Sequence, residues 1–312
     1  MRQDIHDYFR IGTLQWMSFP NLAQCDAVER ICSDDFFDVV EIAPTDVSDR
    51  AAIRDMLASS QTAVCCGVHP AILAKGLNPN AIDEAERERA ERVLLDAVDE
   101  AATLGAEGIA FLAGRWEPEN RDAAVNQLVT TTLRVCRYAA LKGLFVELEV
   151  FDYDVDKSTL IGPASLAAAF AARVCDQVDN FGLIVDLSHI PLTHESIDNA
   201  VSTMAKYTTH FHIGNAVAQK GCENYGDQHP RFGFPNSENG EKELTAFLQA
   251  LKMCGFVKEG SRTILSFEVK PFGGEDSALV LAGCKRTLRR AWAALDGAPD
   301  THEPPMRQFS AS

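Results

Sequence analysis

Basic residues are scarce in this 312-residue chain, in which 29 lysines and arginines stand against 45 aspartates and glutamates, for a formal net charge of −16 at pH 7. Proteins that bind nucleic acid or anionic membrane surfaces neutralise phosphates with lysine and arginine. The charge therefore argues against both kinds of partner. A membrane-spanning helix is not expected either, because no apolar run approaches the roughly 20 residues that it needs.

The sequence also lacks the features of a secretory signal, a disulfide framework and a dinucleotide-binding motif. Residues 1–9 are charged and do not resemble a secretory signal. The nine cysteines contain no CxxC spacing, and an odd number within apolar segments is typical of free thiols in a cytoplasmic protein rather than of a disulfide framework. No GxGxxG follows the first apolar segment, so a dinucleotide-binding sheet lacks its main motif. We expect a cytoplasmic protein without disulfides.

What the sequence does contain is an alternation of strand-like apolar runs with longer helical patterns. The expected strands cover residues 11–17, 37–42, 63–68, 108–112, 144–150, 183–187, 209–213 and 263–269. The expected helices cover residues 21–33, 50–60, 81–104, 122–141, 163–178, 194–207, 240–254 and 276–295. Buried strands separated by helices pair in parallel. Eight such units predict an α/β fold, a single (β/α)₈ TIM barrel over residues 1–297, followed by a flexible tail over 298–312; an open doubly wound sheet is the competing arrangement.

Acid and histidine side chains gather at the ends of the last four expected strands. They are Glu147 and Glu149, Asp186 and His189, His210 and His212, and Glu268 and Lys270. A carboxylate inside an apolar strand is costly to bury unless it is paired, and the carboxyl ends of barrel strands form the catalytic face. We therefore predict that one residue from each strand binds a shared divalent metal ion. The predicted ligands are Glu149, Asp186, His212 and Glu268, with Glu147 as the alternative to Glu149 because it shares the same strand face.

Three carboxylates and one imidazole form an oxygen-rich ligand set. Such a set suits Mn²⁺ best, with Mg²⁺ and Co²⁺ as alternatives. Structural zinc sites usually contain cysteine, and no cysteine lies at these strand ends.

The first four strands and a long loop supply weaker candidates. Residues 214–240 form a loop after the seventh strand, and long loops in compact domains are often functional. The side chains at or beyond the first four strand ends are Trp16, Glu41, His69, Arg115 and Trp116. Because His69 precedes Pro70, an extended loop is expected there. We expect Trp16, His69 and Glu147 to contact a substrate.

The strand-end motifs together resemble one known family. Glu149–Val150, Asp186-x-x-His189, Phe211-His-x-Gly214 and Glu268 follow one another as in the xylose isomerase-like superfamily of sugar phosphate isomerases and epimerases, above all its ketose 3-epimerases. The resemblance implies that Glu149 and Glu268 both bind the metal and exchange a proton with the substrate from opposite faces. It also implies that Asp186 and His212 act only as ligands and that His189 contacts a substrate hydroxyl.

The chain departs from the ketose 3-epimerases around the substrate. That family has a glutamate three residues after the metal-binding histidine and an arginine six residues after it, where this chain has Asn215 and Ala218. It also has a glutamate six residues after the strand-five ligand, where this chain has Val155. The residues expected to replace these substrate contacts are Lys157, Asn215, Asp227, His229, Arg231 and Lys270.

A metal ion held by carboxylates predicts removal of a proton next to a substrate carbonyl, through a metal-bound enediolate. The leading hypothesis is a divalent-metal-dependent sugar isomerase or epimerase.

The alternative is a lyase, because the alpha subunits of C-glycoside deglycosidases also resemble this superfamily and cleave 3-oxo-C-glucosides by elimination with a small beta subunit. A DNA-cleaving apurinic endonuclease is disfavoured by the acidity, and a carbohydrate-binding module would need no metal. We expect a small sugar or oxo-glycoside as substrate and an oligomer, with or without a small second subunit.

Overall fold

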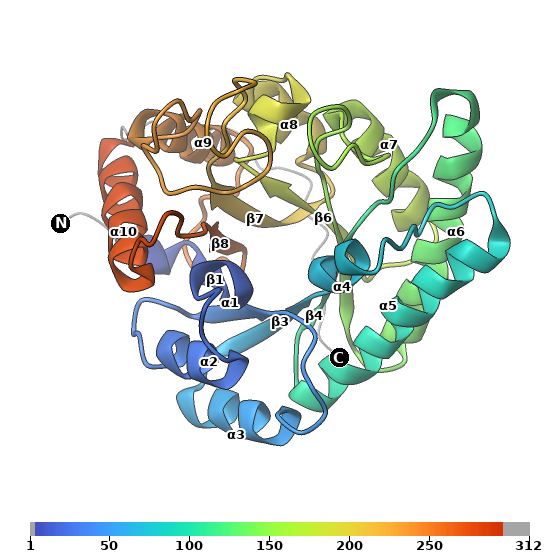
Figure 1. The fold of residues 1–312 in the computed structure, drawn as a ribbon, viewed down its shortest axis with the longest axis horizontal. Coiled ribbons are helices and arrows are strands. Elements are labelled where there is room, and N and C mark those ends of the chain that lie inside the picture. Colours follow the sequence, from blue (N-terminus) through green and yellow to red (C-terminus); the bar gives the residue numbers. More distant parts are fainter. Residues whose placement is uncertain (1–3, 296–312) are drawn as a thin grey trace.

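The fold is a closed barrel of parallel strands with helices around it (Figure 1). The computed structural model describes residues 4–295, and eight strands within them pair in chain order until β8 meets β1. The strands are β1 Arg10–Leu14, β2 Val39–Ile42, β3 Ala63–Gly67, β4 Gly108–Leu112, β5 Phe145–Glu149, β6 Phe181–Asp186, β7 Thr208–Gly214 and β8 Ile264–Glu268. The predicted TIM barrel is confirmed, whereas the predicted tail at 298–312 lies outside the described residues.

Helices occupy the segments that follow each strand of the barrel. They are α1 Gln15–Ser18, α2 Gln24–Cys32, α3 Arg50–Ser60, α4 His69–Ala74, α5 Glu84–Leu104, α6 Arg121–Ala140, α7 Ala164–Cys175, α8 Ile197–Met204, α9 Glu241–Met253 and α10 Ser277–Ala294. Side-chain caps start two of the long ones: Asp83 accepts a hydrogen bond from the amide of Glu86, and Asp276 accepts one from the amide of Leu279. Gly105 ends α5 with a φ of +72°, a left-handed conformation that glycine adopts at little cost.

Two sequence expectations are wrong near the mouth of the barrel. The first strand ends at Leu14, because residues 15–18 turn into α1 instead of extending the strand. His69 does not enter an extended loop before Pro70; it is the first residue of α4. A proline is tolerated in the first turn of a helix, since the amide hydrogen that it lacks has no partner there.

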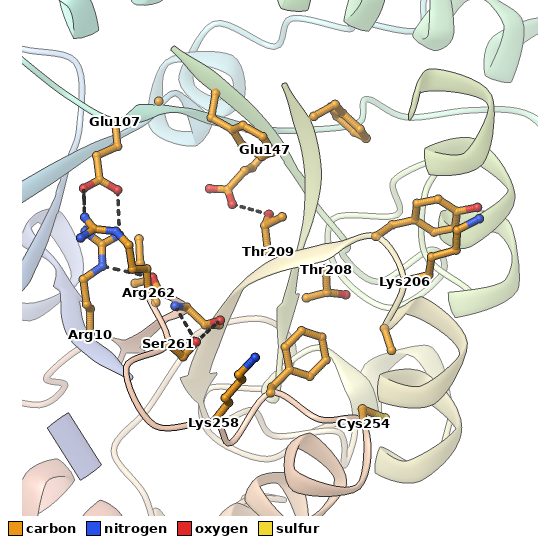
Figure 2. Close-up of a pocket in the computed structure, with 18 of the residues that line it drawn as sticks. Arg10, Glu107, Glu147, Lys206, Thr208, Thr209, Cys254, Lys258, Ser261 and Arg262 are labelled. Carbon is orange, nitrogen blue, oxygen red and sulfur yellow. Dashed lines mark hydrogen bonds and ion pairs between the residues drawn. The ribbon is translucent and has the colours of Figure 1, made fainter. Parts of the chain in front are cut away.

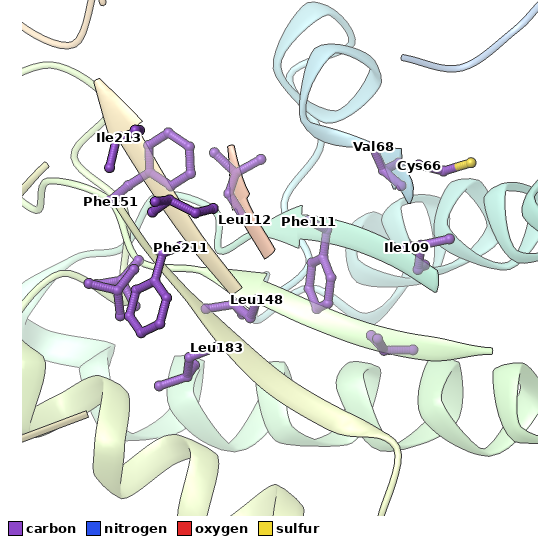
Figure 3. Packing of buried hydrophobic residues seen from close by; sticks show 14 of the residues in the cluster. Cys66, Val68, Ile109, Phe111, Leu112, Leu148, Phe151, Leu183, Phe211 and Ile213 are labelled. Carbon is purple, nitrogen blue, oxygen red and sulfur yellow. The ribbon is translucent and has the colours of Figure 1, made fainter. Parts of the chain in front are cut away.

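Aromatic packing against the helices fixes which strand residues face the barrel interior. Phe211 of β7 lies 5.9 Å from Phe247 of α9 and 4.8 Å from Phe256, measured between ring centroids. Figure 3 shows Phe211 with Leu148 and Leu183 in this apolar layer. Because side chains alternate along a strand, His210 and His212 on either side of Phe211 point to the interior.

Two further expectations were that the cysteines are free thiols and that no helix spans a membrane. All nine cysteines lie within the described residues and are free thiols, as predicted. No helix among residues 4–295 is long and apolar enough to span a membrane.

Candidate metal centre

The predicted metal ligands meet at the carboxyl ends of the last four strands. Ligand atoms from Glu149, Asp186, His212 and Glu268 all lie within 4.8 Å of one another, and the four side chains are buried. The Nδ1 atom of His212 lies 3.0 Å from Oε1 of Glu149 and 2.8 Å from Oε2 of Glu268. Three carboxylates so close together repel one another unless a proton or a cation neutralises them. The donor set therefore fits a divalent metal ion.

Ser188, which the sequence analysis did not single out, holds one of these ligands in place. Its backbone amide donates a hydrogen bond of 2.8 Å to Oδ1 of Asp186, and its hydroxyl donates to Oδ2. Asp186 pairs in register with His212 on the neighbouring strand. Both carboxylate oxygens are thus oriented before any ion binds.

The two glutamates of the cluster differ in their electrostatic surroundings. Burial opposes the charge of Glu149, but His212 and His69 outweigh it and hold the pKa of Glu149 well below its ordinary value. Burial and the nearby charge of Glu149 raise the pKa of Glu268 to about 7, although His229 opposes this increase. Burial disfavours the charged imidazole of His212, yet Glu41 and Glu149 raise its pKa well above the ordinary value. The two glutamates therefore differ in electrostatic surroundings, although both contact the same nitrogen of His212.

A model of the family described as "Xylose isomerase-like TIM barrel" matches residues 23–285, which is most of the chain. The chain belongs to this family. In sequence, no curated protein matches it.

Solved structures share the fold of this xylose isomerase-like barrel at low sequence identity. A D-psicose 3-epimerase from Clostridium cellulolyticum H10 superposes with a TM-score of 0.64 at 17% identity, covering 91% of this chain and 96% of the other. A 3-keto-D-glucoside 4-epimerase from E. coli gives 0.63 at 15% identity, covering 89% and 98%. An AP endonuclease of family 2 from Brucella melitensis gives 0.68 at 18% identity, covering 89% and 98%. At these identities the likeness shows the fold alone.

The long loop of this xylose isomerase-like barrel inserts Asp227 and His229 beside the ligands. Oδ1 of Asp227 lies 2.6 Å from Nε2 of His229 and 3.0 Å from Nε2 of His189. Gly214 lies close to this group, since a Cβ atom there would lie 2.5 Å from the backbone oxygen of Glu268 and 3.1 Å from Nδ1 of His229. Asp186, His189 and His229 form a second group that could hold a metal ion. Burial opposes charge on His229, but Asp227 and Glu268 raise its pKa to about 9.

Two of the predicted substrate-contacting histidines differ in how their nitrogen atoms are used. In His189, Nδ1 contacts the carbonyl of Val150 at 2.8 Å and Nε2 contacts Asp227, so both nitrogens have protein partners. His69 is buried, and its Nε2 lies 3.1 Å from Oε2 of Glu149, close enough for an ion pair. Its Nδ1 has no hydrogen-bond partner among the described groups. A buried unsatisfied nitrogen calls for an explanation, and a substrate would supply one.

Trp16 lies on the same side of the mouth as His69. Its indole covers Gly67 at the end of β3, where a Cβ atom would lie 2.3 Å from the ring. The side chain is only partly buried. An aromatic surface is therefore available beside Gly67, two residues before His69.

Three other residues that were predicted to contact a substrate form contacts away from the four predicted metal ligands. Asn215 is fully buried and organises the long loop: its amide donates to the carbonyl of Arg231 at 2.9 Å, and its oxygen accepts from the amide of Asn239 at 2.7 Å. Arg231 itself donates to Glu275 at 2.7 Å. Lys270 places its ammonium 5.4 Å from the ring of Phe272. None of these three contacts links to the four predicted ligands.

Glu147 points into a cavity at the opposite end of the barrel (Figure 2). This cavity of about 800 Å³ lies at the amino ends of the strands. Glu147 accepts a hydrogen bond of 2.6 Å from the hydroxyl of Thr209, and Arg10 pairs with Glu107 on the far wall. Glu147 shares the strand face of Glu149, as predicted, but lies two residues, or roughly 7 Å, deeper. A substrate bound at the metal ligands would therefore not meet Glu147.

Proposed function

We propose that this chain is a divalent-metal-dependent sugar isomerase or epimerase. The observation that carries the proposal is that two buried glutamates from different strands, Glu149 and Glu268, flank one imidazole nitrogen of His212 at 3.0 and 2.8 Å. A divalent ion held there, for which Mn²⁺ is our first choice and Mg²⁺ or Co²⁺ the alternatives, would act as a Lewis acid towards a substrate carbonyl. The two glutamates would carry the proton.

The two glutamates lie on different strands and beside different histidines. Glu149 is beside His69, and Glu268 is beside His229. One glutamate would remove the proton from the substrate carbon as a general base, and a proton would then be returned by a general acid. Return of the proton to the other face of the same carbon gives epimerisation, and return to the neighbouring carbon gives isomerisation.

The proposed substrate is a small sugar that carries a keto group. His69 offers an Nδ1 atom that no described group satisfies, and Trp16 offers an aromatic face to the C–H surface of a sugar ring. Two structural relatives, a D-psicose 3-epimerase and a 3-keto-D-glucoside 4-epimerase, are named for the same class of compound.

Reaction in heavy water tests this proposal. The Mn²⁺-loaded protein is incubated with a panel of ketoses, inososes and 3-oxo-glucosides, and products are analysed by NMR for deuterium at the carbon next to the carbonyl. We expect deuterium at the epimerised or isomerised position, and we expect Glu268→Gln to abolish its incorporation. A product that retains the original hydrogen would indicate a hydride shift and overturn the proton-transfer mechanism.

A second candidate is a lyase that cleaves 3-oxo-C-glucosides by elimination, as the alpha subunit of a C-glycoside deglycosidase. It is favoured by the buried position of Asn215 and by Ala218, which leave the ketose 3-epimerase substrate contacts without counterparts. Abstraction of the same proton would then expel the aglycone. Release of free aglycone from a 3-oxo-C-glucoside, with or without an added small subunit, would favour the lyase, whereas recovery of an intact epimer would favour the epimerase.

A further inference from the structure

The imidazole of His212 lies between two sets of carboxylates. On one side, Nδ1 faces Glu149 and Glu268 of the metal centre. On the other side, Nε2 lies 3.2 Å from both carboxylate oxygens of Glu41, which comes from β2 across the barrel. Glu41 and His212 are 1% and 0% exposed. The carboxylate of Glu41 thus faces the one nitrogen of His212 that the metal would not use.

This geometry assigns Glu41 a role that neither the motifs nor the comparisons indicate. We propose that Glu41 is a positioning residue that presents the lone pair of His212 Nδ1 to the metal ion. A neutral imidazole carries its single hydrogen on one nitrogen and its free lone pair on the other. A carboxylate that accepts a hydrogen bond from Nε2–H keeps the hydrogen there and leaves Nδ1 free to bind a metal. The inference rests on the proposed metal centre.

Glu41 is itself held in place by His210, a residue of β7 that lies nearer the amino ends of the strands than His212. Nε2 of His210 lies 3.1 Å from Oε1 of Glu41, and Nδ1 of His210 lies 3.2 Å from Oε2 of Glu147. Thr209 in turn donates a hydrogen bond to Glu147. These side chains alternate between carboxylate and imidazole from the metal centre down to the cavity shown in Figure 2. A carboxylate fixed in this way lies on the far side of His212 from the predicted ligands and would influence them through that imidazole.

Two substitutions of Glu41 separate positioning from general loss of structure. Glu41→Gln keeps an oxygen that can accept from Nε2–H, while Glu41→Leu removes the acceptor. The matched control is Glu107→Gln, which changes a carboxylate paired with Arg10 at the other end of the barrel. For each purified protein, the Mn²⁺ dissociation constant is measured by competition with a chelator. Thermal unfolding of the metal-free protein shows whether each variant folds.

Loss of an outer hydrogen-bond partner typically weakens metal binding by about 10- to 100-fold. We expect Glu41→Leu to fall in this range, Glu41→Gln to lie between it and the wild type, and Glu107→Gln to bind like the wild type. Long-range ¹H–¹⁵N correlation spectra of the Zn²⁺-loaded proteins should show His212 protonated on Nε2 in the wild type, with that signal altered in Glu41→Leu. If Glu41→Leu fails to fold, Glu41→Gln alone still decides through its affinity and its spectrum.

Each contrary result has a distinct meaning. Wild-type affinity in a folded Glu41→Leu protein, or in Glu41→Gln if Leu does not fold, overturns the inference and leaves the proposed function intact. Because Glu41, His210 and His212 could also hold an ion themselves, two bound ions in the wild type and one in Glu41→Gln would make Glu41 a ligand and likewise overturn the inference. A wild-type protein that binds no divalent ion would overturn the proposed function together with the inference.

Discussion

The ammonium group of Lys157 lies 3.1 Å from Oδ2 of Asp227, and this contact joins the loop after β5 to the long loop after β7. The other oxygen of Asp227 contacts both His189 and His229. The segment that carries Lys157 is ordered by Asp152, a fully buried carboxylate that accepts a hydrogen bond of 2.8 Å from the Lys157 amide. Lys157 therefore connects a hydrogen-bonded turn to the residues beside the predicted metal ligands.

The first prediction concerns this pair. Lys157→Met and Asp227→Asn should each destabilise the protein, and together by less than the sum, because each single change leaves part of a buried charge network uncompensated. Contacting residues in one network typically show coupling energies of about 0.5–3 kcal/mol. A double-mutant cycle from urea unfolding measures the coupling. Lys142→Met, which removes a surface partner of Asp99, is the control and should have a much smaller effect; strict additivity of Lys157→Met and Asp227→Asn would contradict the prediction.

Alternation and spacing were sufficient to predict the barrel and the grouping of Glu149, Asp186, His212 and Glu268 at one end of it. The apolar residues around His212 and Glu149 define strands, and the period of two places the polar side chains on the interior face. The same period could not separate Glu147 from Glu149, because both face the interior and only the position along the barrel axis differs. Nor could it show that Asn215 faces its own loop, since a loop side chain finds its partners only after the chain has folded.

The second prediction concerns removal of the metal. Mn²⁺ should raise the unfolding temperature of chelator-treated protein, because an ion that binds only the folded state stabilises it, by about 2.7 kcal/mol at a hundredfold excess over the dissociation constant. Differential scanning calorimetry with and without Mn²⁺ measures the shift. Asp186→Asn, which removes one ligand charge, should reduce it. An equal shift in the wild type and in Asp186→Asn would place the ion elsewhere.

The third prediction concerns acid stability at the other end of the barrel. Glu107 accepts hydrogen bonds of 2.6 and 2.7 Å from the two terminal nitrogens of Arg10. Partial burial raises the pKa of Glu107, but Arg10 outweighs it and holds the pKa below its ordinary value. A carboxyl group with a lowered pKa contributes stability that is present above its unfolded pKa, about 4.3 for glutamate, and is lost as the pH falls through the folded pKa.

Wild type and Glu107→Gln should therefore differ most in unfolding free energy at neutral pH and converge below about pH 4. The control is Glu119→Gln, which changes an exposed carboxylate in the short turn before α6 and should give a nearly constant difference. Urea unfolding at a series of pH values provides the comparison. A difference for Glu107→Gln that grows as the pH falls would contradict the assigned direction of the pKa shift.

The last prediction separates the two glutamates of β5. Glu149 lies 3.0 Å from His212 at the metal centre, whereas Glu147 contacts His210 and Thr209 beside the cavity at the amino ends of the strands. Glu149→Gln removes a ligand charge and a proton carrier at once, so both metal affinity and turnover should fall, the latter by about 10²- to 10⁴-fold if Glu149 is a general base. Glu147→Gln should leave Mn²⁺ affinity within a few-fold of the wild type, because the Glu147 side chain is connected to the predicted ligands through His210 and Glu41 and does not contact them itself. Chelator competition and deuterium exchange, measured on both variants, decide between them. The reverse outcome, a metal-free Glu147→Gln and an active Glu149→Gln, would move the ion deeper into the barrel and would contradict the four-ligand centre.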